Sequence, residues 1–418
     1  MLSGTVFFLD FRGRRFYDGG GLDALINPFM RNSTMPARRK PPIREEDVGS
    51  LGCLKSMARL TSILHACAPS ANRILRYDHL MNLLLLMFFN PVITSLRDLS
   101  ALSGLKKVRE KLGTPSFGKS TIAEAMRVFD PSLLAEVVAE LSGRVPERGC
   151  EALKDLGKIL EGIDGTLLRA LPRMTWAVWV DEDNRAAKLH VCFDVLKEVP
   201  TVVNLTEATG RETDFERANL KKGHLYITDR GYEKYSVFQE IMDAGASFVC
   251  RIKSDSVMRA VEEKALSDCD RKCGIARDRI VRLGADPEAQ GLLEPVRVVE
   301  IEADTRDGMT RMLIATDRFD ISAEIVALIY RHRWKVELFF RWLKHTLNFR
   351  HLLSDTRNGV TIQVYAAIIA TLLVAIIGRR KPNKRVYVMI SLYLVGLASE
   401  EELINYIRSL PLAEGLGA

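Results

Sequence analysis

The sequence has few cysteines, and they are not arranged as a disulfide framework or a zinc site. Its seven cysteines are an odd number, and no Cys-x-x-Cys pair is present. Scattered cysteines of this kind argue against the disulfide scaffolds of secreted proteins and against structural zinc sites. Cys269 and Cys273 lie close in sequence, but no second pair stands near them and His224 is distant. A protein of the reducing cytoplasm fits best.

The sequence also lacks a signal peptide and has only one long apolar run. The apolar residues 5–9 are followed at once by Arg12, Arg14 and Arg15, which is unlike the leader of an exported protein. Residues 360–378 are nearly long enough to span a bilayer. The alanine and threonine content of this run and the absence of a second span favour a buried core helix. The sequence therefore predicts a protein without membrane association.

Neither sign of charge is scarce, and the balance is only slightly basic. The chain has 60 Lys and Arg against 53 Asp and Glu, which gives a formal net charge of +7. This excess is compatible with an anionic partner but does not by itself identify one. A hydrophobic content of 47% excludes a disordered chain, and 418 residues predict two or three domains.

The first 148 residues divide into a tail and a helical region. Residues 1–45 are rich in Gly, Arg and Pro without periodicity. They are either a flexible tail or upstream sequence translated from too early a start, with Met30 or Met35 as the true start. Residues 46–148 carry apolar residues at three- and four-residue spacing, with Ser95 as a candidate N-cap. This pattern predicts a helical domain whose basic residues face either DNA phosphates or solvent.

After residue 149 the pattern changes to short β-type runs, which predicts an α/β domain. The runs are GIDGTLLRAL, AAKLHVCFDVL, PTVVNLTEA and GHLYITDRGY, with one helix-like segment before the last. Residues 247–318 add strand-like pieces around a charged stretch, and we interpret them as a β-rich insertion. A long helix begins after Ser322, a good N-cap, and the apolar helix up to residue 378 follows it.

The long helix carries the most informative pattern in the sequence. Tyr330, Arg333, Glu337 and Lys344 stand at offsets of 0, 3, 7 and 14. These offsets place the four residues within roughly 60° of arc on an α-helix, so they form one stripe. An apolar stripe lies about a quarter-turn away, which puts the polar stripe at the border of the buried face. For Arg333 and Glu337 alone, an ordinary ion pair on an amphipathic helix is the alternative explanation.

Two aspartates stand at the ends of separate strand-like runs, Asp164 in GIDGT and Asp229 in ITDRGY. Aspartates at strand ends can converge on a helix carboxylate such as Glu337. Three carboxylates without a His or Cys cluster suit a hard ion such as Mg²⁺ or Mn²⁺. Two such ions about 4 Å apart can drive the in-line displacement of a phosphodiester. The alternative for each aspartate is a turn or cap residue.

These residues resemble the signature of the insertion-sequence-4 type of DDE transposase. The resemblance covers roughly residues 155–378, and the Tyr-Arg-Glu-Lys spacing matches without departure. The matching residues are Asp164, Asp229 within DRGY, Tyr330, Arg333, Glu337 and Lys344.

The resemblance implies an α/β fold with a ribonuclease-H-like core, a mixed sheet flanked by helices. Its first strand would carry Asp164, and its fourth, neighbouring strand would carry Asp229. The implied domains, listed in order, are a tail at 1–45, a helical DNA-binding domain at 46–148, the first part of the core at 149–246, a β-rich insertion at 247–318, the rest of the core at 319–378 and a basic helical tail at 379–418.

The resemblance also implies catalytic and DNA-binding roles. Asp164, Asp229 and Glu337 would be catalytic and would bind two Mg²⁺ or Mn²⁺ ions. The DNA-binding candidates are Tyr330, Arg333 and Lys344 at phosphates near the cut, and Arg341 and Lys335 on the exposed face, where solvated charge is equally compatible.

The implied function is that of a transposase, which cleaves DNA at the ends of its element and transfers the strand to target DNA. Its partners would be terminal inverted repeats and target DNA, bound by a homodimer in the bacterial cytoplasm at the nucleoid. A metal-dependent nuclease or resolvase of the same fold is one alternative. A catalytically silent DNA-binding repressor is another, against which the intact carboxylate trio argues.

Overall fold

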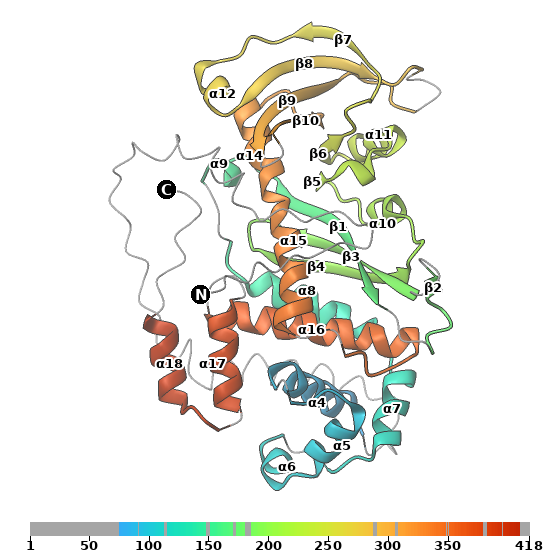
Figure 1. Cartoon of the computed structure of the whole chain (residues 1–418), viewed down its shortest axis with the longest axis vertical. Helices are drawn as coiled ribbons and strands as arrows, with labels where there is room; N and C mark the ends of the chain where they lie inside the picture. Colours follow the sequence, from blue (N-terminus) through green and yellow to red (C-terminus); the bar gives the residue numbers. More distant parts are fainter. Residues whose placement is uncertain are drawn as a thin grey trace.

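A computed structural model describes most of the chain between residues 75 and 409 (Figure 1). The tail at 1–45, the first part of the expected helical domain at 46–74, and residues 379–382, 395 and 410–418 of the expected basic tail lie outside the described residues. The described ranges are 75–90, 92–112, 115–147, 151–169, 173–179, 185–286, 291–305, 308–347, 349, 351–378, 383–394 and 396–409.

One mixed sheet runs through the described part of the chain. Its order is β2-β3-β1-β5-β6-β10-β9-β8-β7, and β4 also pairs with β3. The strands are β1 (Ile159–Arg169), β2 (Val178–Trp179), β3 (Arg185–Asp194), β4 (Val199–Glu207), β5 (His224–Thr228), β6 (Ser247–Ile252), β7 (Met258–Glu263), β8 (Ile275–Leu283), β9 (Val296–Thr305) and β10 (Gly308–Thr316).

The parallel pairing of β1 and β5 brings Asp164 and Asp229 level with each other. Asp164 lies in the middle of β1 (Ile159–Arg169), so the expectation that it ends its strand is wrong, whereas Asp229 directly follows β5 as expected. β1, β3 and β4 are antiparallel neighbours, whereas β5 lies parallel to β1 and β6 parallel to β5. Gly162 is in register with Ile227 across the β1–β5 pair. Two residues further along each chain come Asp164 and Asp229, which are therefore level with each other.

Helices cover both faces of this part of the sheet. One face packs against α14 (Ala323–His332), α15 (Trp334–Arg341) and the π-helix η3 (Trp342–Thr346), and the other against α10 (Glu212–Ala218) and α11 (Tyr235–Asp243). Side chains alternate along β1 accordingly. Leu160 belongs to the core that includes Val336 of α15, and Ile163 to the core that includes Phe215 of α10.

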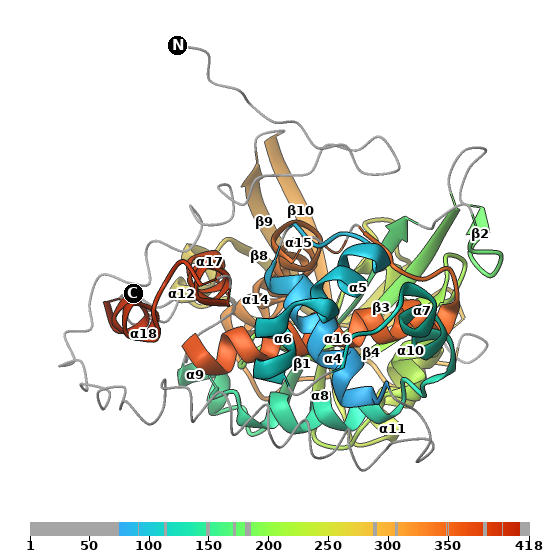
Figure 2. The same ribbon diagram turned by 90° about the horizontal axis from the view of Figure 1, so that it is seen from below.

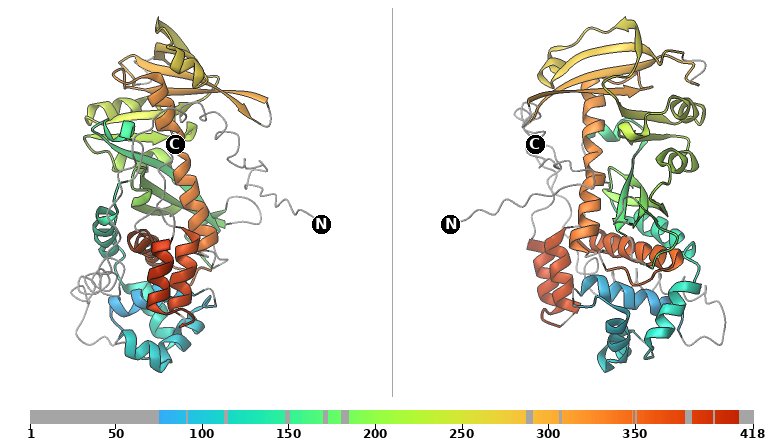
Figure 3. Two further views of the ribbon diagram at one scale, coloured as in Figure 1. Left: turned by 90° about the vertical axis from the view of Figure 1, so that its left-hand side faces the viewer. Right: turned by 45° about the vertical axis from the view of Figure 1, so that its right-hand side comes forward.

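The helix expected after Ser322 is present as the consecutive segments α14, α15 and η3, which cross the sheet as a single column in Figure 3. Ser322 is the N-cap residue by backbone conformation, but its side chain makes no capping hydrogen bond. The predicted helix therefore exists, and its last turn is wider than an α-helical turn.

The apolar run at 360–378 lies in α16 (Arg357–Gly378), the described helix that is long and apolar enough to cross a membrane. As much as 83% of its candidate span is buried inside the protein. α16 packs against α4, α7, α8 and β4, so the expectation of a core helix is confirmed.

The helical end of the molecule surrounds α16 (Figure 2). Ser95 caps α5 as expected, with its hydroxyl accepting from Asp98 N. The remaining helices are α4 (Tyr77–Phe89), α5 (Leu96–Gly104), α6 (Lys106–Leu112), α7 (Lys119–Val128), α8 (Leu133–Arg144), α9 (Glu151–Lys154), η2 (Arg230–Tyr232), α12 (Asp268–Lys272), α17 (Lys384–Leu394) and α18 (Glu400–Ser409).

The strand-like pieces expected at 247–318 are strands of the same sheet. β6 pairs with β5 on one side and with β10 on the other, and β9, β8 and β7 follow outward. Figure 1 shows these outer strands at the end of the molecule opposite the N-terminal helices. The predicted α/β class, a large mixed sheet flanked by helices, is confirmed.

Candidate active site

Every second residue of β1 faces the helical column. A Cβ added at Gly162 would lie 2.7 Å from Val336 Cγ2, so the absence of a side chain lets α15 lie directly on the strand. Asp164 comes next on this face, and Arg333 Nη1 lies 3.4 Å from its Oδ2. Thr166 follows, and its hydroxyl accepts a hydrogen bond from Lys344 Nζ at 2.7 Å. The strand thus offers an acid and a hydroxyl to two residues of the helical column that are about three turns apart.

Asp229 follows β5 directly, where its extended backbone leads into η2. The hydroxyl of Tyr330 donates to Asp229 Oδ1 at 3.0 Å, and Arg251 Nη1 lies 3.9 Å from the same oxygen. Tyr330 is buried, so this hydrogen bond fixes the carboxylate from the helix side. Asp164 and Asp229 therefore both contact α14 or its junction with α15.

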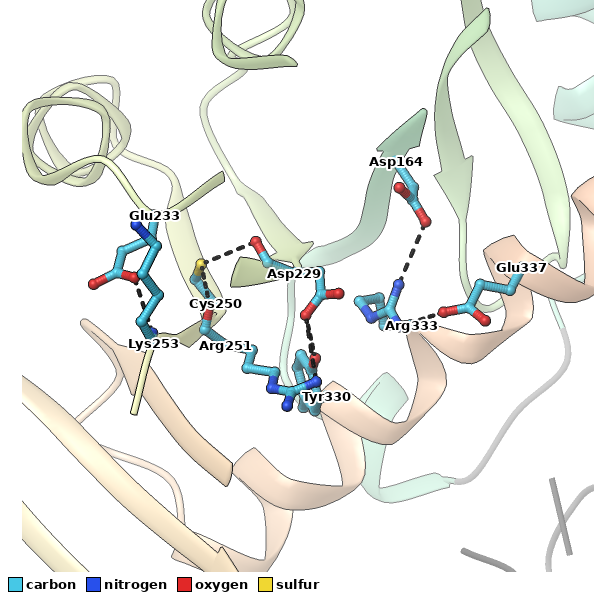
Figure 4. Close-up of polar contacts among 9 residues, drawn as sticks. All are labelled: Asp164, Asp229, Glu233, Cys250, Arg251, Lys253, Tyr330, Arg333 and Glu337. Atoms are coloured by element: carbon cyan, nitrogen blue, oxygen red, sulfur yellow. Dashed lines mark hydrogen bonds and ion pairs between the residues drawn. The ribbon is translucent and has the colours of Figure 1, made fainter. Parts of the chain in front are cut away.

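Arg333 lies at the centre of the three acids (Figure 4). Besides its contact with Asp164, its Nη2 donates to Glu337 Oε1 at 2.5 Å. The Arg333 side chain is only 11% exposed. Among the described residues, no three His, Cys, Asp or Glu side chains are close enough to hold a metal ion as they stand. The acids are gathered around a guanidinium instead of directly around one another.

The acids are partly desolvated, which raises the cost of their negative charge. Burial raises the pKa of Asp164 to about 7, although Arg333 opposes the shift. Burial also raises the pKa of Glu337, again against the effect of Arg333. Burial acts in the same direction on Asp229, but Arg333 and the Arg230 backbone N–H outweigh it, so its pKa is below the usual value. Arg333 and the more distant Arg251 bring two positive charges to three carboxylates, so the site favours additional positive charge.

The donor set fits divalent magnesium or manganese. Asp164, Asp229 and Glu337 supply only carboxylate oxygens, the ligands that these ions prefer. The three side chains come from the middle of β1, from the residue after β5 and from the facing helix, and all lie near Arg333. The excess of negative charge in a partly desolvated site is the observation that supports a cation there.

The predicted DNA-binding residues are placed differently from one another. Tyr330 and Arg333 are turned into the carboxylate site, and Lys344 lies beside β1. Arg341 is exposed. Lys335 forms an ion pair with Glu198 at 2.9 Å and donates to the Val195 carbonyl, with a side chain only 10% exposed. The expectation that Lys335 lies on an exposed face is corrected by this pairing.

Sequence reasoning missed Thr166 and the role of Gly162. A period of two in GIDGT places Gly162, Asp164 and Thr166 on one face, and this signal was available. His190 lies on β3 opposite Gly165 of β1. It is buried and its Nε2 lies 2.9 Å from Thr206 Oγ1, but its Nδ1 has no hydrogen-bond partner in the described structure.

Comparison with known proteins supplies the family context. The model of the family described as "Transposase DDE domain" matches residues 162–373. A putative transposase y4zB of Sinorhizobium fredii is 28% identical over 275 residues, covering 65% of this chain and 74% of the relative. A probable transposase for insertion sequence element IS5377 of Geobacillus stearothermophilus is 26% identical over 263 residues, covering 62% and 67%.

Two further likenesses are more distant. A putative transposase for insertion sequence element IS4SA of Synechocystis is 19% identical over 265 residues, covering 62% of this chain and 71% of the relative. Among solved structures, a piggyBac transposase synaptic complex with hairpin DNA is similar with a TM-score of 0.41 and 11% identity, covering 90% of this chain and 88% of that one. The family match spans β1, β5 and the whole helical column.

Proposed function

This chain belongs to the transposase DDE domain family, and from that premise we propose that Asp164, Asp229 and Glu337 are its catalytic carboxylates. Its relatives are insertion-sequence transposases, and the chain is a DDE transposase of the insertion-sequence-4 type. It is an enzyme that cleaves and transfers DNA strands. The single observation that carries the residue assignment is the convergence of these three acids on Arg333, from level positions in β1 and just after β5 and from the facing helix.

DDE transposases generally use divalent metal ions. We propose that Asp164, Asp229 and Glu337 hold two Mg²⁺ or Mn²⁺ ions. When bound, such ions activate the attacking water or 3′-hydroxyl and stabilise the leaving oxygen of the phosphodiester. Arg333 would have to leave the oxygens of Asp164 and Glu337 before these carboxylates could hold a cation.

The chain's own residues orient the acids. The Gly165 backbone N–H donates to Asp164 Oδ1 at 2.8 Å, and the Tyr330 hydroxyl holds Asp229 Oδ1. Arg333, once released from the acids, carries a planar guanidinium that can bind two phosphate oxygens. Lys344 would supply a point charge to a neighbouring phosphate, and exposed Arg341 a more distant contact.

We propose a ribonuclease-H-like core made of β1, β3, β4, β5 and β6 with α14 to α16. Three antiparallel strands followed by two parallel ones, in the order β4-β3-β1-β5-β6, support this assignment. The β-rich insertion would be the outer strands β7 to β10 within 247–318, with β6 serving the core. The segment 46–148 would be the DNA-binding domain. The core would resume at residue 319, and 379–418 would form a basic tail after it.

The substrate proposed is the element's terminal inverted repeats together with target DNA. Two ends must be held together for transposition, so a homodimer on DNA is proposed. The bacterial cytoplasm, at the nucleoid, is the compartment where these partners meet.

The test is Mg²⁺-dependent cleavage of a duplex carrying the terminal repeat that flanks the gene. Wild type should cut it, and Glu337→Gln should cut on the order of a thousandfold more slowly, because a metal ligand and its charge are lost. Glu324→Gln is the matched control, since Glu324 lies in the first turn of α14, at the other end of the same helical column. Equal cutting by wild type and Glu337→Gln would remove Glu337 from the mechanism.

A further inference from the structure

Lys344 is a half-buried cation held by a neutral group. Its Nζ donates to Thr166 Oγ1 at 2.7 Å, and burial lowers its pKa. In the part of the chain that the structure describes, no acidic side chain forms an ion pair with it. A hydroxyl accepts a hydrogen bond but neutralises no charge, so the ammonium remains suited to an anion.

Three other basic side chains around β1 and the helical column are paired with acids. Lys188 Nζ lies 2.6 Å from Glu212 Oε1, and Lys335 Nζ lies 2.9 Å from Glu198 Oε1. Arg333 bridges two carboxylates of the site. Lys344 differs from these described neighbours because its ammonium group is oriented by the neutral Thr166 hydroxyl and not by an acid.

Thr166 is well placed to orient the Lys344 ammonium. It lies two residues after Asp164 on the same face of β1, which is about 7 Å along the strand. Its β-branched side chain has restricted χ1 rotation, so its hydroxyl is held in one direction. A lysine has a long flexible stem, and a single fixed acceptor at its tip restricts where the charge lies.

The π-helix that carries Lys344 also helps to place its side chain. Lys344 lies in the π-helix Trp342–Thr346, where the turn is wider than in an α-helix. Trp342 Nε1 donates to Thr371 Oγ1 of α16 at 3.1 Å, and Leu343 is fully buried. These two anchors hold the π-turn against the core and leave Lys344 facing β1.

We propose that Thr166 is a positioning residue for strand cleavage: its hydroxyl holds the Lys344 ammonium where it binds a phosphate oxygen of the DNA strand engaged by the carboxylates. The inference rests on the proposed function. One ammonium hydrogen is used by Thr166, and the other two remain for phosphate oxygens. Thr166 does not touch the reacting atoms and acts through Lys344.

The experiment compares Thr166→Val, which keeps the shape but removes the acceptor, with Thr166→Ser, which keeps the hydroxyl. Single-turnover cleavage of the terminal-repeat duplex in Mg²⁺ should slow about tenfold for Thr166→Val and stay near wild type for Thr166→Ser. Lys344→Gln should slow cleavage at least as much. Adding Thr166→Val to Lys344→Gln should cause no further loss, because the interaction is already absent.

A second readout separates positioning from general structure. The logarithm of the association constant for the same duplex is measured against the logarithm of the salt concentration, where each phosphate contact contributes a slope of about −0.9. Lys344→Gln and Thr166→Val should both have a shallower slope by up to about one contact. Thr361→Val, which alters a threonine bonded to the Arg357 carbonyl on α16, is the matched control and should change neither readout.

The outcomes distinguish this inference from the proposed function. If wild type cuts and Glu337→Gln does not, then wild-type cleavage by Thr166→Val overturns the inference alone. The inference is also overturned if the double variant loses as much cleavage rate as the two single variants added together. Such a result would mean that Thr166 and Lys344 act independently and that each substitution only weakens the structure. If Glu337→Gln cuts like wild type, it is the proposed function that fails.

Discussion

Arg333 acts as an internal counter-ion for the carboxylates at this site. It contacts Asp164 and Glu337, and it lowers the pKa of Asp229. Without it, three partly desolvated carboxylates would face one another. Because a divalent ion and a guanidinium neutralise the same oxygens, the two should compete for the site.

Replacing Arg333 by Gln should therefore destabilise the metal-free protein and increase its response to metal. Leaving buried carboxylates unpaired is expected to cost about 2–4 kcal/mol in the free energy of unfolding. Excess Mn²⁺ should restore more stability to Arg333→Gln than it adds to wild type, as measured by urea denaturation with and without chelator. Arg251→Gln is the control, since Arg251 lies 3.9 Å from Asp229 at a more exposed position. Equal stabilisation of Arg333→Gln and wild type by Mn²⁺ would contradict the competition.

The sequence patterns singled out three acids that the structure places around Arg333, but not their present contacts. The position of Asp229 after a strand and the spacing of Glu337 on the helix are local patterns, whereas Asp164 lies inside its strand and not at the expected end. The contact of Lys344 with Thr166 joins residues 178 positions apart in sequence. No local pattern encodes such a contact. Lys335 shows the same limit, because its partner Glu198 lies far from it in sequence, in the turn between β3 and β4.

At the scale of elements, the close approach of α15 to β1 depends on Gly162. Gly162→Ala would bring Cβ within 2.7 Å of Val336 Cγ2, and the β-branched Val336 has little rotational freedom on a helix. We expect a loss of about 1–3 kcal/mol in the free energy of unfolding and slower cleavage, because α15 carries Glu337. Urea denaturation and the cleavage assay measure the two effects.

The double variant Gly162→Ala with Val336→Ala supplies the rescue. The smaller side chain makes room for the new Cβ, so cleavage should recover partly towards wild type. Gly143→Ala is the matched control, because nothing lies within 4 Å of its added Cβ and it stands on helix α8. Unchanged cleavage in Gly162→Ala would show that the helix position does not depend on this contact.

The long helix also shows what a periodic pattern can predict. A repeat of apolar and polar residues correctly predicted a helix from Ser322 onward. The pattern assumed one α-helical pitch throughout, whereas the segment ends in a π-turn at Trp342–Thr346. That turn is held by Trp342 on Thr371 of another helix, so it depends on tertiary packing that the helix's own sequence does not contain.

At the scale of the whole molecule, the sequence predicted the α/β class and the strand-like pieces at 247–318. It did not predict that β6 and β10 join the two groups of strands into one sheet. That pairing connects Leu313 with Ile252, residues far apart in sequence, and strand pairing partners are not specified by alternation alone. The continuity has an energetic consequence, because the outer strands cannot separate without exposing an edge of the core sheet.

Substitution of a buried ion pair in the outer strands can test whether they unfold together with the rest of the sheet. Arg297 Nη2 lies 2.7 Å from Asp278 Oδ2, and the two side chains are 2% and 5% exposed. Arg297 also donates to the Arg318 carbonyl, just before α14. Arg297→Met leaves Asp278 buried without its partner, which should cost about 3–5 kcal/mol. Replacing Asp278 by Leu in addition should recover much of that loss.

Because one sheet joins the outer strands to the strands of the active site, Arg297→Met should shift the unfolding of the whole described region and not of the outer strands alone. Urea transitions followed by tryptophan fluorescence should coincide with those followed by far-UV circular dichroism. The fluorescence reports on Trp176, Trp179, Trp334 and Trp342, all of which lie outside the outer strands. Arg311→Met, at an arginine that is 69% exposed, should shift the transition far less. A separate early transition in circular dichroism, with fluorescence unchanged, would mean that the outer strands unfold independently and that Arg297 stabilises only them.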